Sequence, residues 1–306
     1  MAATSSALIT AEIRADEYAG SQPLVLGKTG GGSLLVSGRI FGRELRAYEG
    51  FVGPVDGGVL YMGVSLRGGT LGGNSTVYDV TGTTSGGTVA PGGITPATRF
   101  GILRIFGNLQ PVAQTTFSFE IGGITPGTQH DQILMDGGYS ADINSAALVV
   151  QLANNFSPTP GQTFRIIDKS AGGPTLRNFA GKPEGSSFQT AGFNWTITYA
   201  GGDGNDVILT AGTPLAPAAP LAFSGAPVIQ PADGVDGARI TTAVSGPPGA
   251  LVRLESSADL GLTIPWLAIS QITLDGSGNG NFTNVADPRS VATTPAPKNF
   301  FRLVID

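Results

Sequence analysis

Short runs of apolar and β-branched residues alternate with turn-forming residues along most of the chain. Glycine or proline interrupts nearly every window that is long enough for an amphipathic helix. β-prone runs bounded by Gly, Pro, Asn and Asp indicate strands, so the pattern predicts an all-β protein with little helix. The strongest runs are LLVSGRIF, GVLYMGVSL, RFGILRIFG, TTFSFEIGG, DQILMDG, AALVVQLA, TFRIIDKS, FNWTITYA and DVILTA.

The spacing of the runs divides the chain. Between residues 66 and 211 a run comes roughly every 10 to 20 residues, which fits stacked coils and a sandwich alike. The proline-rich segment TPLAPAAPL, residues 213–221, has little to bury and predicts a linker. After it, shorter alternating strands with turns every ~8 to 12 residues predict a compact antiparallel sandwich.

The composition indicates many turns and few charged surfaces. Of 306 residues, 47 are glycine and 21 are proline, and only 13% are charged. A net charge of -5, with scattered basic residues, lacks the Lys/Arg-rich face that nucleic-acid binding needs, so no nucleic-acid partner is expected. The absence of cysteine excludes disulfides, thiol catalysis and cysteine-ligated zinc, and the single His130 cannot form a multi-histidine metal site.

The sequence offers no membrane span, because no apolar run approaches the ~18 residues that a spanning helix needs. The opening MAATSSALIT lacks a basic region followed by an apolar core. If the native protein is secreted, Met1 stands in place of a removed signal peptide, and Ala2 and Ala3 are what remains beside a small-residue cleavage site.

A repeated motif carries a resemblance to a known family. The run GGTLGGNSTVYDVTGTTSGGTVAPGG, residues 68–93, resembles the autotransporter-associated β-strand repeat of bacterial surface proteins. The resemblance implies a right-handed parallel β-helix, in which inward apolar residues stack from coil to coil. Its polar segment YDVTGTTSGG departs from the pattern, and we expect that segment to bulge from a coil. The similarity continues through ILRIFGNL, TTFSFEIGG, HDQILMDG, FSPTPGQTFRIID and ITYAGGDGNDVILT.

The C-terminal block is similar to a different module. LVRLESSADLGLTIPWLAISQITLDGSGNGNF, VADPRS and FFRLVI resemble a β-sandwich found at the ends of secreted verrucomicrobial and planctomycete-type proteins. This resemblance implies a small antiparallel β-sandwich of the Ig/FnIII-like kind, without a single assigned activity. The predicted domains are an N-terminal β cap or strand-donor region (1–64), a β-helix (65–211), a Pro/Ala linker (212–221) and a β-sandwich (222–306).

The stretch GGDGNDVIL, residues 201–209, fits the calcium-binding nonapeptide pattern at every fixed position. Asp203, Asn205 and Asp206 are therefore weak candidate calcium ligands. In nonapeptide arrays each ion lies between consecutive copies, whereas this chain has one copy. A single copy favours a tight glycine turn, with Val207 and Leu209 entering the core and the fold needing no cofactor.

Two neighbouring residues, His130 and Asp131, have the composition of an acid–base pair. Neither Ser140 nor Ser145 lies in a nucleophile-elbow motif, and turn chemistry is the simpler interpretation. Polysaccharide lyases and hydrolases on β-helix folds gather acidic and basic groups in one cleft, but charged residues at strand ends are usually solvated. The candidates for such a cleft are Asp131, Asp136, Asp142, Asp168, Lys169 and Arg177.

Exposed aromatic side chains are the other signature of glycan binding. Trp195 alternates with apolar residues in a predicted strand, and Trp266 follows a proline in the predicted sandwich. Their β spacing places both in the core rather than on a binding surface.

The family resemblance implies a secreted structural or adhesive protein, an adhesin of the bacterial cell surface, and the residue patterns point to no catalytic residues. We expect a homo-oligomer or a filament, because the end coils of a β-helix carry unpaired backbone groups. The N-terminal segment SSALITAEIRADEYAG, with its alternating residues 8–13, can add a strand to a neighbour or cap its own chain. The alternative function is a carbohydrate-binding or polysaccharide-active β-helix protein, with surface glycans as partners.

Overall fold

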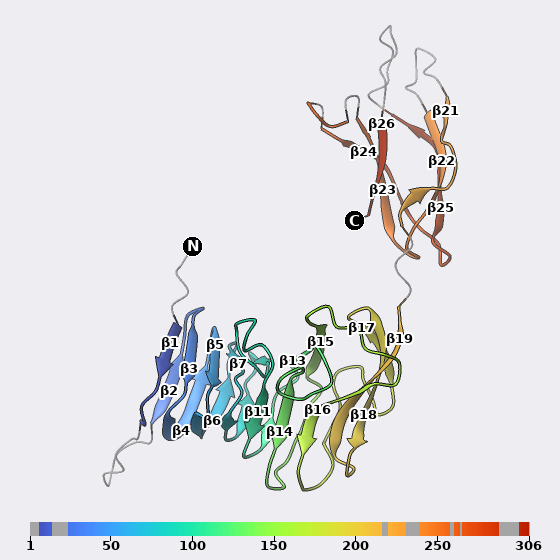
Figure 1. The fold of residues 1–306 in the computed structure, drawn as a ribbon. Helices are drawn as coiled ribbons and strands as arrows, with labels where there is room; N and C mark the ends of the chain where they lie inside the picture. The colour runs from blue at the N-terminus through green and yellow to red at the C-terminus, as the bar shows by residue number, and fades with distance from the viewer. Residues whose placement is uncertain are drawn as a thin grey trace. The chain divides into compact units, whose positions relative to one another are not determined.

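The computed structural model describes residues 6–13, 24–215, 220–230, 239–257, 260–263, 265–287 and 300–305. Within these residues the chain has 26 strands and no helix, which confirms the predicted all-β class. Contacts divide the chain into two compact units, Met1–Leu215 and Ala216–Asp306 (Figure 1). The described part of the chain contains no helix long and apolar enough to cross a membrane.

The first unit contains a seven-stranded sheet in which every neighbouring pair is parallel. Neighbours in this sheet are not neighbours in the sequence, because the chain leaves the sheet after each strand and returns beside the strand it left. In spatial order the strands are β1 (Ser6–Ile9), β3 (Ser33–Val36), β5 (Phe51–Pro54), β7 (Thr70–Leu71), β10 (Gly87–Val89), β13 (Thr115–Ile121) and β15 (Ala147–Leu152).

Between successive strands of that sheet, the chain forms strands of a second, twelve-stranded sheet. Its pairs are parallel as far as β16, after which β16, β19, β18 and β17 pair antiparallel. The C-terminal end of this sheet therefore consists of antiparallel strands. The strands are β2 (Val25–Lys28), β4 (Arg39–Ala47), β6 (Val59–Leu66), β8 (Thr76–Val77), β9 (Val80–Gly82), β11 (Ile102–Ile105), β12 (Leu109–Gln110), β14 (Gln132–Met135), β16 (Thr163–Lys169), β17 (Ser187–Thr190), β18 (Phe193–Gly201) and β19 (Asp206–Pro214).

The core of the first unit lies on the inner faces of these sheets and follows from their register. Parallel in-register pairing aligns Val52, Leu71, Val89 and Phe117 across four strands. All four side chains have no exposed surface. Because a strand turns alternate side chains to opposite faces, the residues on either side of this row point outward. Each fully buried side chain of this kind contributes about 1.5–3 kcal/mol.

The second unit contains two antiparallel sheets. One comprises β20 (Ala222–Phe223), β21 (Val228–Gln230), β22 (Arg239–Ser245) and β25 (Asn279–Ala286). The other comprises β23 (Leu251–Ser257), β24 (Leu267–Thr273) and β26 (Phe300–Ile305). Both sheets contribute to one small core, which consists of Ile240, Val244, Val252, Leu254, Leu274 and Phe282.

Every strong sequence run contains a strand, but the domain boundaries differ in detail. Strand β6 crosses residue 64, where the sequence predicted the end of a separate cap, and residues 24–64 form strands of the same two sheets as the rest of the unit. Strand β19 runs to Pro214, so residues 212–214 of the predicted linker are part of a sheet, while residues 216–219 lie outside the described residues.

The polar segment YDVTGTTSGG does not bulge from the stack as expected. It contributes β9, and its Val80 pairs in register with Val64 and is fully buried. One apolar residue at the inward position is sufficient to keep the segment in the sheet, because the flanking polar residues lie on the outer side.

The N-terminal segment packs within its own chain where it is described. Strand β1 pairs in parallel with β3, and Ile13 forms an isolated bridge with Ile40. At residues 6–9 the predicted strand donor therefore pairs with its own chain. Residues 1–5 and 14–23 lie outside the described residues.

Candidate functional site

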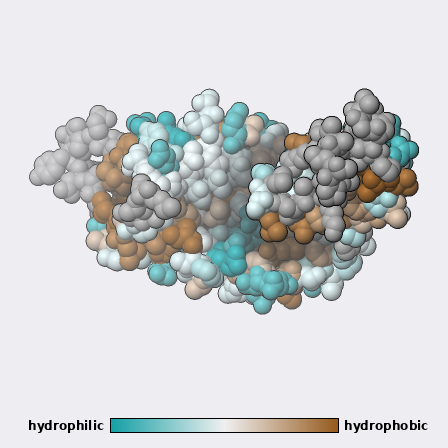
Figure 2. Space-filling model, turned by 90° about the horizontal axis from the view of Figure 1, so that it is seen from above, coloured by the Kyte–Doolittle hydropathy of each residue, from teal (hydrophilic) through white to brown (hydrophobic). Residues whose placement is uncertain are grey.

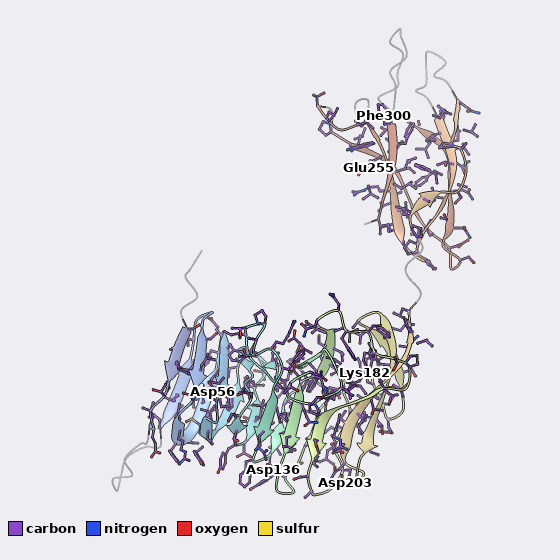
Figure 3. All side chains as sticks on the ribbon, viewed as in Figure 1. Asp56, Asp136, Lys182, Asp203, Glu255 and Phe300 are labelled. Atoms are coloured by element: carbon purple, nitrogen blue, oxygen red, sulfur yellow. The ribbon has the colours of Figure 1, made fainter. Side chains whose placement is uncertain are left out.

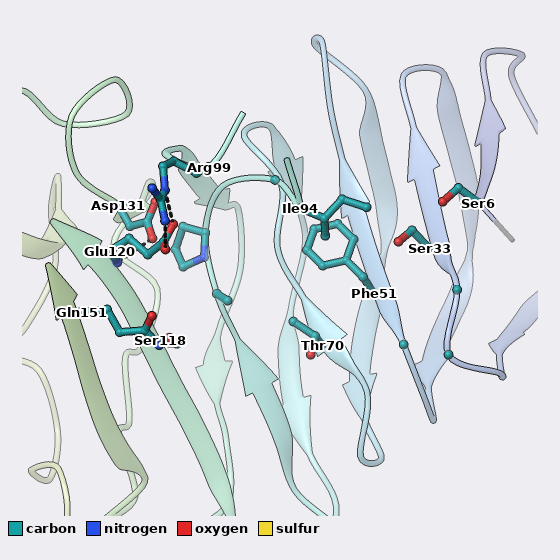
Figure 4. Close-up of a pocket in the computed structure, with 16 residues that line it drawn as sticks. Ser6, Ser33, Phe51, Thr70, Ile94, Arg99, Ser118, Glu120, Asp131 and Gln151 are labelled. Atoms are coloured by element: carbon teal, nitrogen blue, oxygen red, sulfur yellow. Dashed lines mark hydrogen bonds and ion pairs between the residues drawn. The ribbon is translucent and has the colours of Figure 1, made fainter. Parts of the chain in front are cut away.

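The outer face of the seven-stranded sheet carries a trough of about 560 Å³ (Figure 4). Outward side chains of the sheet form its floor, and the connection from β10 to β11, residues 90–101, forms a wall. That connection contains the turn-forming sequence APGGITPATRFG, so it folds back over the sheet instead of extending it.

The register of the strands builds the floor. Ser6, Ser33, Phe51 and Thr70 occupy equivalent positions on four neighbouring parallel strands. Glu120 of β13 is likewise paired with Gln151 of β15 at the opposite end of the trough. The floor therefore presents outward polar or aromatic side chains from β1, β3, β5, β7, β13 and β15.

The ring of Phe51 lies flat on a glycine surface within this floor. A Cβ added to Gly72 would lie 2.4 Å from ring atom Cε2, and one added to Gly53 would lie 2.8 Å from Cε1. Only glycine leaves room for the ring at these two positions.

Arg99 and Glu120 form the charged part of the trough. The carboxylate of Glu120 accepts hydrogen bonds from Arg99 Nη2 at 2.7 Å and from Nε at 3.1 Å. This two-bond geometry raises the pKa of Arg99 above its ordinary value. Arg99 Nη1 also donates to Asn154 Oδ1 at 3.3 Å. The guanidinium is therefore held in place and its charge is compensated.

Asp131 anchors the wall of the trough to the sheet. It is 1% exposed, and its two carboxyl oxygens accept hydrogen bonds from the backbone N–H of Glu120 at 2.8 Å and of Gly101 at 3.1 Å. Burial raises the pKa of Asp131 to about 8, against the lowering effect of these N–H groups. The residue acts as a positioning group for Glu120 and for the connection that carries Arg99.

His130 does not form a catalytic pair with Asp131. Its ring is 2% exposed and packs edge-on against Phe164, with centroids 5.6 Å apart. Nδ1 lies 3.1 Å from the carbonyl oxygen of Gly123, and burial lowers the pKa of His130. Both residues were expected in a turn, but they are buried: His130 packs on Phe164, and Asp131 is held by the backbone of β13 and of the folded-back connection.

The remaining acid–base candidates lie in separate ion pairs instead of one cleft. Asp136 pairs with Arg104. Asp142 pairs with Arg177 at 2.7 Å. Figure 3 labels Asp136 at the lower rim of the first unit. Neither Asp136 nor Asp142 lines the trough. They are the solvated or paired charges expected at strand ends.

Lys169, another candidate for the cleft, is buried instead of solvated. Its side chain is 2% exposed, and Nζ donates to the carbonyl oxygen of Gly173 at 2.6 Å. Burial lowers the pKa of Lys169, while the neighbouring Asp206 and Asp203 raise it. Asp168, the adjacent candidate, pairs with Arg165 at 3.3 Å.

The nonapeptide stretch forms the turn of the β18–β19 hairpin, with Gly201 paired to Asp206. Asp206 is 1% exposed, and its Oδ1 accepts from the backbone N–H of Lys169 at 2.8 Å. Its other carboxyl oxygen lies 3.2 Å from Arg165 Nε. Both carboxyl oxygens of this candidate ligand are thus occupied by protein groups.

The other two calcium candidates face different surroundings. Asp203 is exposed at the tip of the turn, at the lower rim of the first unit (Figure 3). Asn205 is 5% exposed, and its backbone carbonyl oxygen accepts from Thr175 Oγ1 at 2.7 Å, whereas its side-chain Oδ1 has no hydrogen-bond partner among the described residues. Among the described residues no group of three His, Asp or Glu side chains is arranged to hold a metal ion. Val207 and Leu209 are fully buried.

Trp195 is fully buried, as expected, and its Nε1 donates to the carbonyl oxygen of Thr190 at 3.0 Å. Trp266 is only half-buried, which differs from the expected core position. The guanidinium carbon of Arg302 lies 4.5 Å from the centroid of its ring.

Of the charged residues in the trough, the sequence singled out Asp131 but not Arg99 or Glu120. Arg99 and Glu120 are 21 positions apart and meet only because the connection after β10 folds back. The available signal was the Gly/Pro-rich connection itself, since loops of this kind on rigid sheets often carry function.

Comparison of the chain with models of known families, with curated proteins and with solved structures finds no match.

Proposed function

We propose that this chain is a structural and adhesive protein of the bacterial cell exterior. Its first unit is a right-handed parallel β-helix of the autotransporter-passenger type, and its second unit is an Ig/FnIII-like β-sandwich. Parallel strands that alternate between two sheets, with inward residues aligned in rows, support the β-helix. Right-handedness follows the general preference of crossovers between parallel strands. The GGTLGG and SGGT motifs support the passenger type and the extracellular location.

The observation that carries the proposal is the pair of open edges of the seven-stranded sheet. Strands β1 and β15 stand at its two ends, and no strand in the described residues pairs with their outer sides. Their sequences, SALI and ALVVQL, contain no charged residue and no proline. Natural edge strands usually carry such residues to prevent pairing with another chain.

The two edges are complementary to each other. Because every strand of the sheet is parallel, β15 of one copy can receive β1 of the next in the same direction. Leu8 is 58% exposed and Val149 is 37% exposed. Figure 2 shows brown, hydrophobic surface on the side of the first unit where its N-terminal strands lie. A head-to-tail contact of this kind need not close into a ring, and the open form is a fibre.

Light scattering over a concentration series, together with negative-stain imaging, tests the proposal. The wild-type chain should form elongated assemblies, and Val149→Lys should reduce them to monomers because it introduces a charge on an edge strand. Thr116→Lys is the matched control, since Thr116 lies on β13, which is already paired on both sides. Wild-type monomers at every concentration, or an equal effect of both substitutions, would refute self-association.

Polysaccharide cleavage is the alternative function, favoured by the presence of two carboxyl groups in the trough. Glu120 is bound to Arg99, and both oxygens of Asp131 accept backbone hydrogen bonds. A panel of hydrolase and lyase substrates tests it. Turnover that is lost in Glu120→Gln would replace the structural proposal with an enzymatic one.

A further inference from the structure

The trough crosses the strands instead of following them. Its lining extends from Ser6 of β1 to Gln151 of β15, which are the two end strands of the sheet. A ligand lying in it therefore runs along the direction in which the strands stack. Outward side chains on adjacent strands are ~4.8 Å apart, a spacing similar to the length of one sugar unit in an extended glycan.

The lining combines hydroxyl, amide and apolar groups. Thr70 and Ser118 offer hydroxyls that donate and accept hydrogen bonds, and Gln151 offers an amide. Ile94, which is 52% exposed, adds apolar surface on the other side of Thr70, beside the 9% exposed ring of Phe51 (Figure 4). Ligand sites typically combine an apolar lining with a few polar groups of this kind. Sugar rings match this lining, because they have hydroxyls at their edges and C–H groups on their faces.

Charge in the trough favours an uncharged ligand. Arg99 is neutralised by Glu120 through two hydrogen bonds, and Asp131 is directed at backbone N–H groups. Among the described lining residues Arg99 is the one cationic side chain, so these residues offer an anionic ligand no uncompensated positive charge. The Arg99–Glu120 pair still offers outward donors and acceptors, which suit the neighbouring hydroxyls of a sugar.

We propose that this trough binds an extended, uncharged glycan, laid across the strands from the region of Phe51 to the Arg99–Glu120 pair. The inference rests on the proposed adhesive function, whose ligand class it names. Sugar rings lie against the exposed side chain of Ile94, beside the mostly buried Phe51, and their hydroxyls bind the Arg99–Glu120 pair and Gln151.

Affinity gel electrophoresis of the full chain tests the site, with mixed-linkage β-glucan, xylan and galactomannan as neutral probes and polygalacturonate as the charged probe. Ile94→Ala should weaken binding of the retained neutral glycan about tenfold, because it removes apolar surface from the trough. Ile124→Ala is the matched control: the two isoleucines are 52% and 61% exposed, and Ile124 is not among the trough residues.

Glu120→Gln provides an independent test of the preference for an uncharged glycan. It removes the negative charge beside Arg99, so affinity for the neutral glycan should fall while affinity for polygalacturonate rises. Circular dichroism and thermal unfolding of each variant exclude loss of folding as the cause.

Failure to retain any neutral probe would overturn the inference, as would equal effects of Ile94→Ala and Ile124→Ala. Stronger wild-type binding of polygalacturonate would also overturn it. If glycan binding fails these tests, the proposal of self-association still stands, because light scattering tests it separately. Conversely, a monomeric wild-type chain that binds a neutral glycan through Ile94 rejects self-association alone.

Discussion

The ring of Phe41 stacks on the ring of Tyr61, with centroids 4.3 Å apart and planes inclined by 3°. The two residues are register partners on β4 and β6, so parallel pairing brings like side chains together. Tyr78, Phe106 and Tyr139 continue the row at centroid distances of 5.4, 5.4 and 5.6 Å. Tyr61 lies between the fully buried Leu60 and Met62, so this row is on the outer face of the twelve-stranded sheet.

Removing a ring from the middle of this row should destabilise the first unit. Tyr61 contacts one ring on each side, and each aromatic pair is worth ~0.5–1.5 kcal/mol beyond the area buried. We expect Tyr61→Ala to lower the free energy of unfolding by about 2 kcal/mol. Tyr61→Phe keeps the ring and should match the wild type. Denaturant unfolding followed by far-UV circular dichroism measures both, and an unchanged alanine variant would show that the row contributes no stability.

Burial of Asp131 should make stability depend on pH. Burial raises the pKa of Asp131 to about 8 in the folded chain, whereas in the unfolded chain it has the ordinary aspartate value of 3.8. Between these values the folded state holds a proton that the unfolded state releases, so the free energy of unfolding falls as pH rises from about 4 to about 8. The maximum slope is about 1.4 kcal/mol per pH unit.

Unfolding titrations at several pH values measure that slope. Asp131→Asn cannot titrate and should flatten the profile over this range. Asp56→Asn is the control, because Asp56 is exposed and has a positive φ of 51°, which asparagine also tolerates. A wild-type profile as flat as that of Asp131→Asn would contradict the prediction.

The sequence predicted the strands well because each carries its own signal of alternating apolar residues. The direction of pairing has no such signal: FNWTITYA and DVILTA form an antiparallel hairpin, whereas TTFSFEIGG and AALVVQLA pair in parallel. The motif resemblance supplied the parallel expectation. Two-residue strands such as β7 and β12 escaped detection, because pairing with neighbours defines them more than their own sequence.

The trough was less accessible to sequence reasoning for a physical reason. Its charged pair joins Arg99 to Glu120 across a connection whose path depends on the turns around Pro91 and Pro96. Asp131, one of the acidic candidates from the sequence, does line the trough. However, it is buried, and its carboxyl group accepts backbone hydrogen bonds. Residue type alone does not distinguish an exposed carboxylate from one that holds a loop.

The first unit should keep its stability without calcium. In the hairpin turn both carboxyl oxygens of Asp206 are occupied, by Lys169 N–H and by Arg165. Melting temperatures in chelator and in millimolar calcium should therefore agree, and Asp203→Ala should behave like the wild type. Stabilisation of several degrees by calcium, absent in Asp203→Ala, would instead indicate a bound ion that the fold depends on.

A methyl group at Gly72 should disturb the floor of the trough. The added Cβ would lie 2.4 Å from the carbonyl oxygen of Ala90 and 2.4 Å from the ring of Phe51, so backbone or ring must move. We expect Gly72→Ala to lower the free energy of unfolding by about 2 kcal/mol, the usual cost of overpacking. Gly31→Ala is the matched control in the same trough, because an added Cβ there meets nothing within 4 Å, and its effect should stay within about 0.5 kcal/mol. Denaturant unfolding compares the pair. Equal midpoints would contradict the close packing of both the Phe51 ring and the Ala90 carbonyl oxygen on Gly72, because these two contacts are what distinguish Gly72 from Gly31.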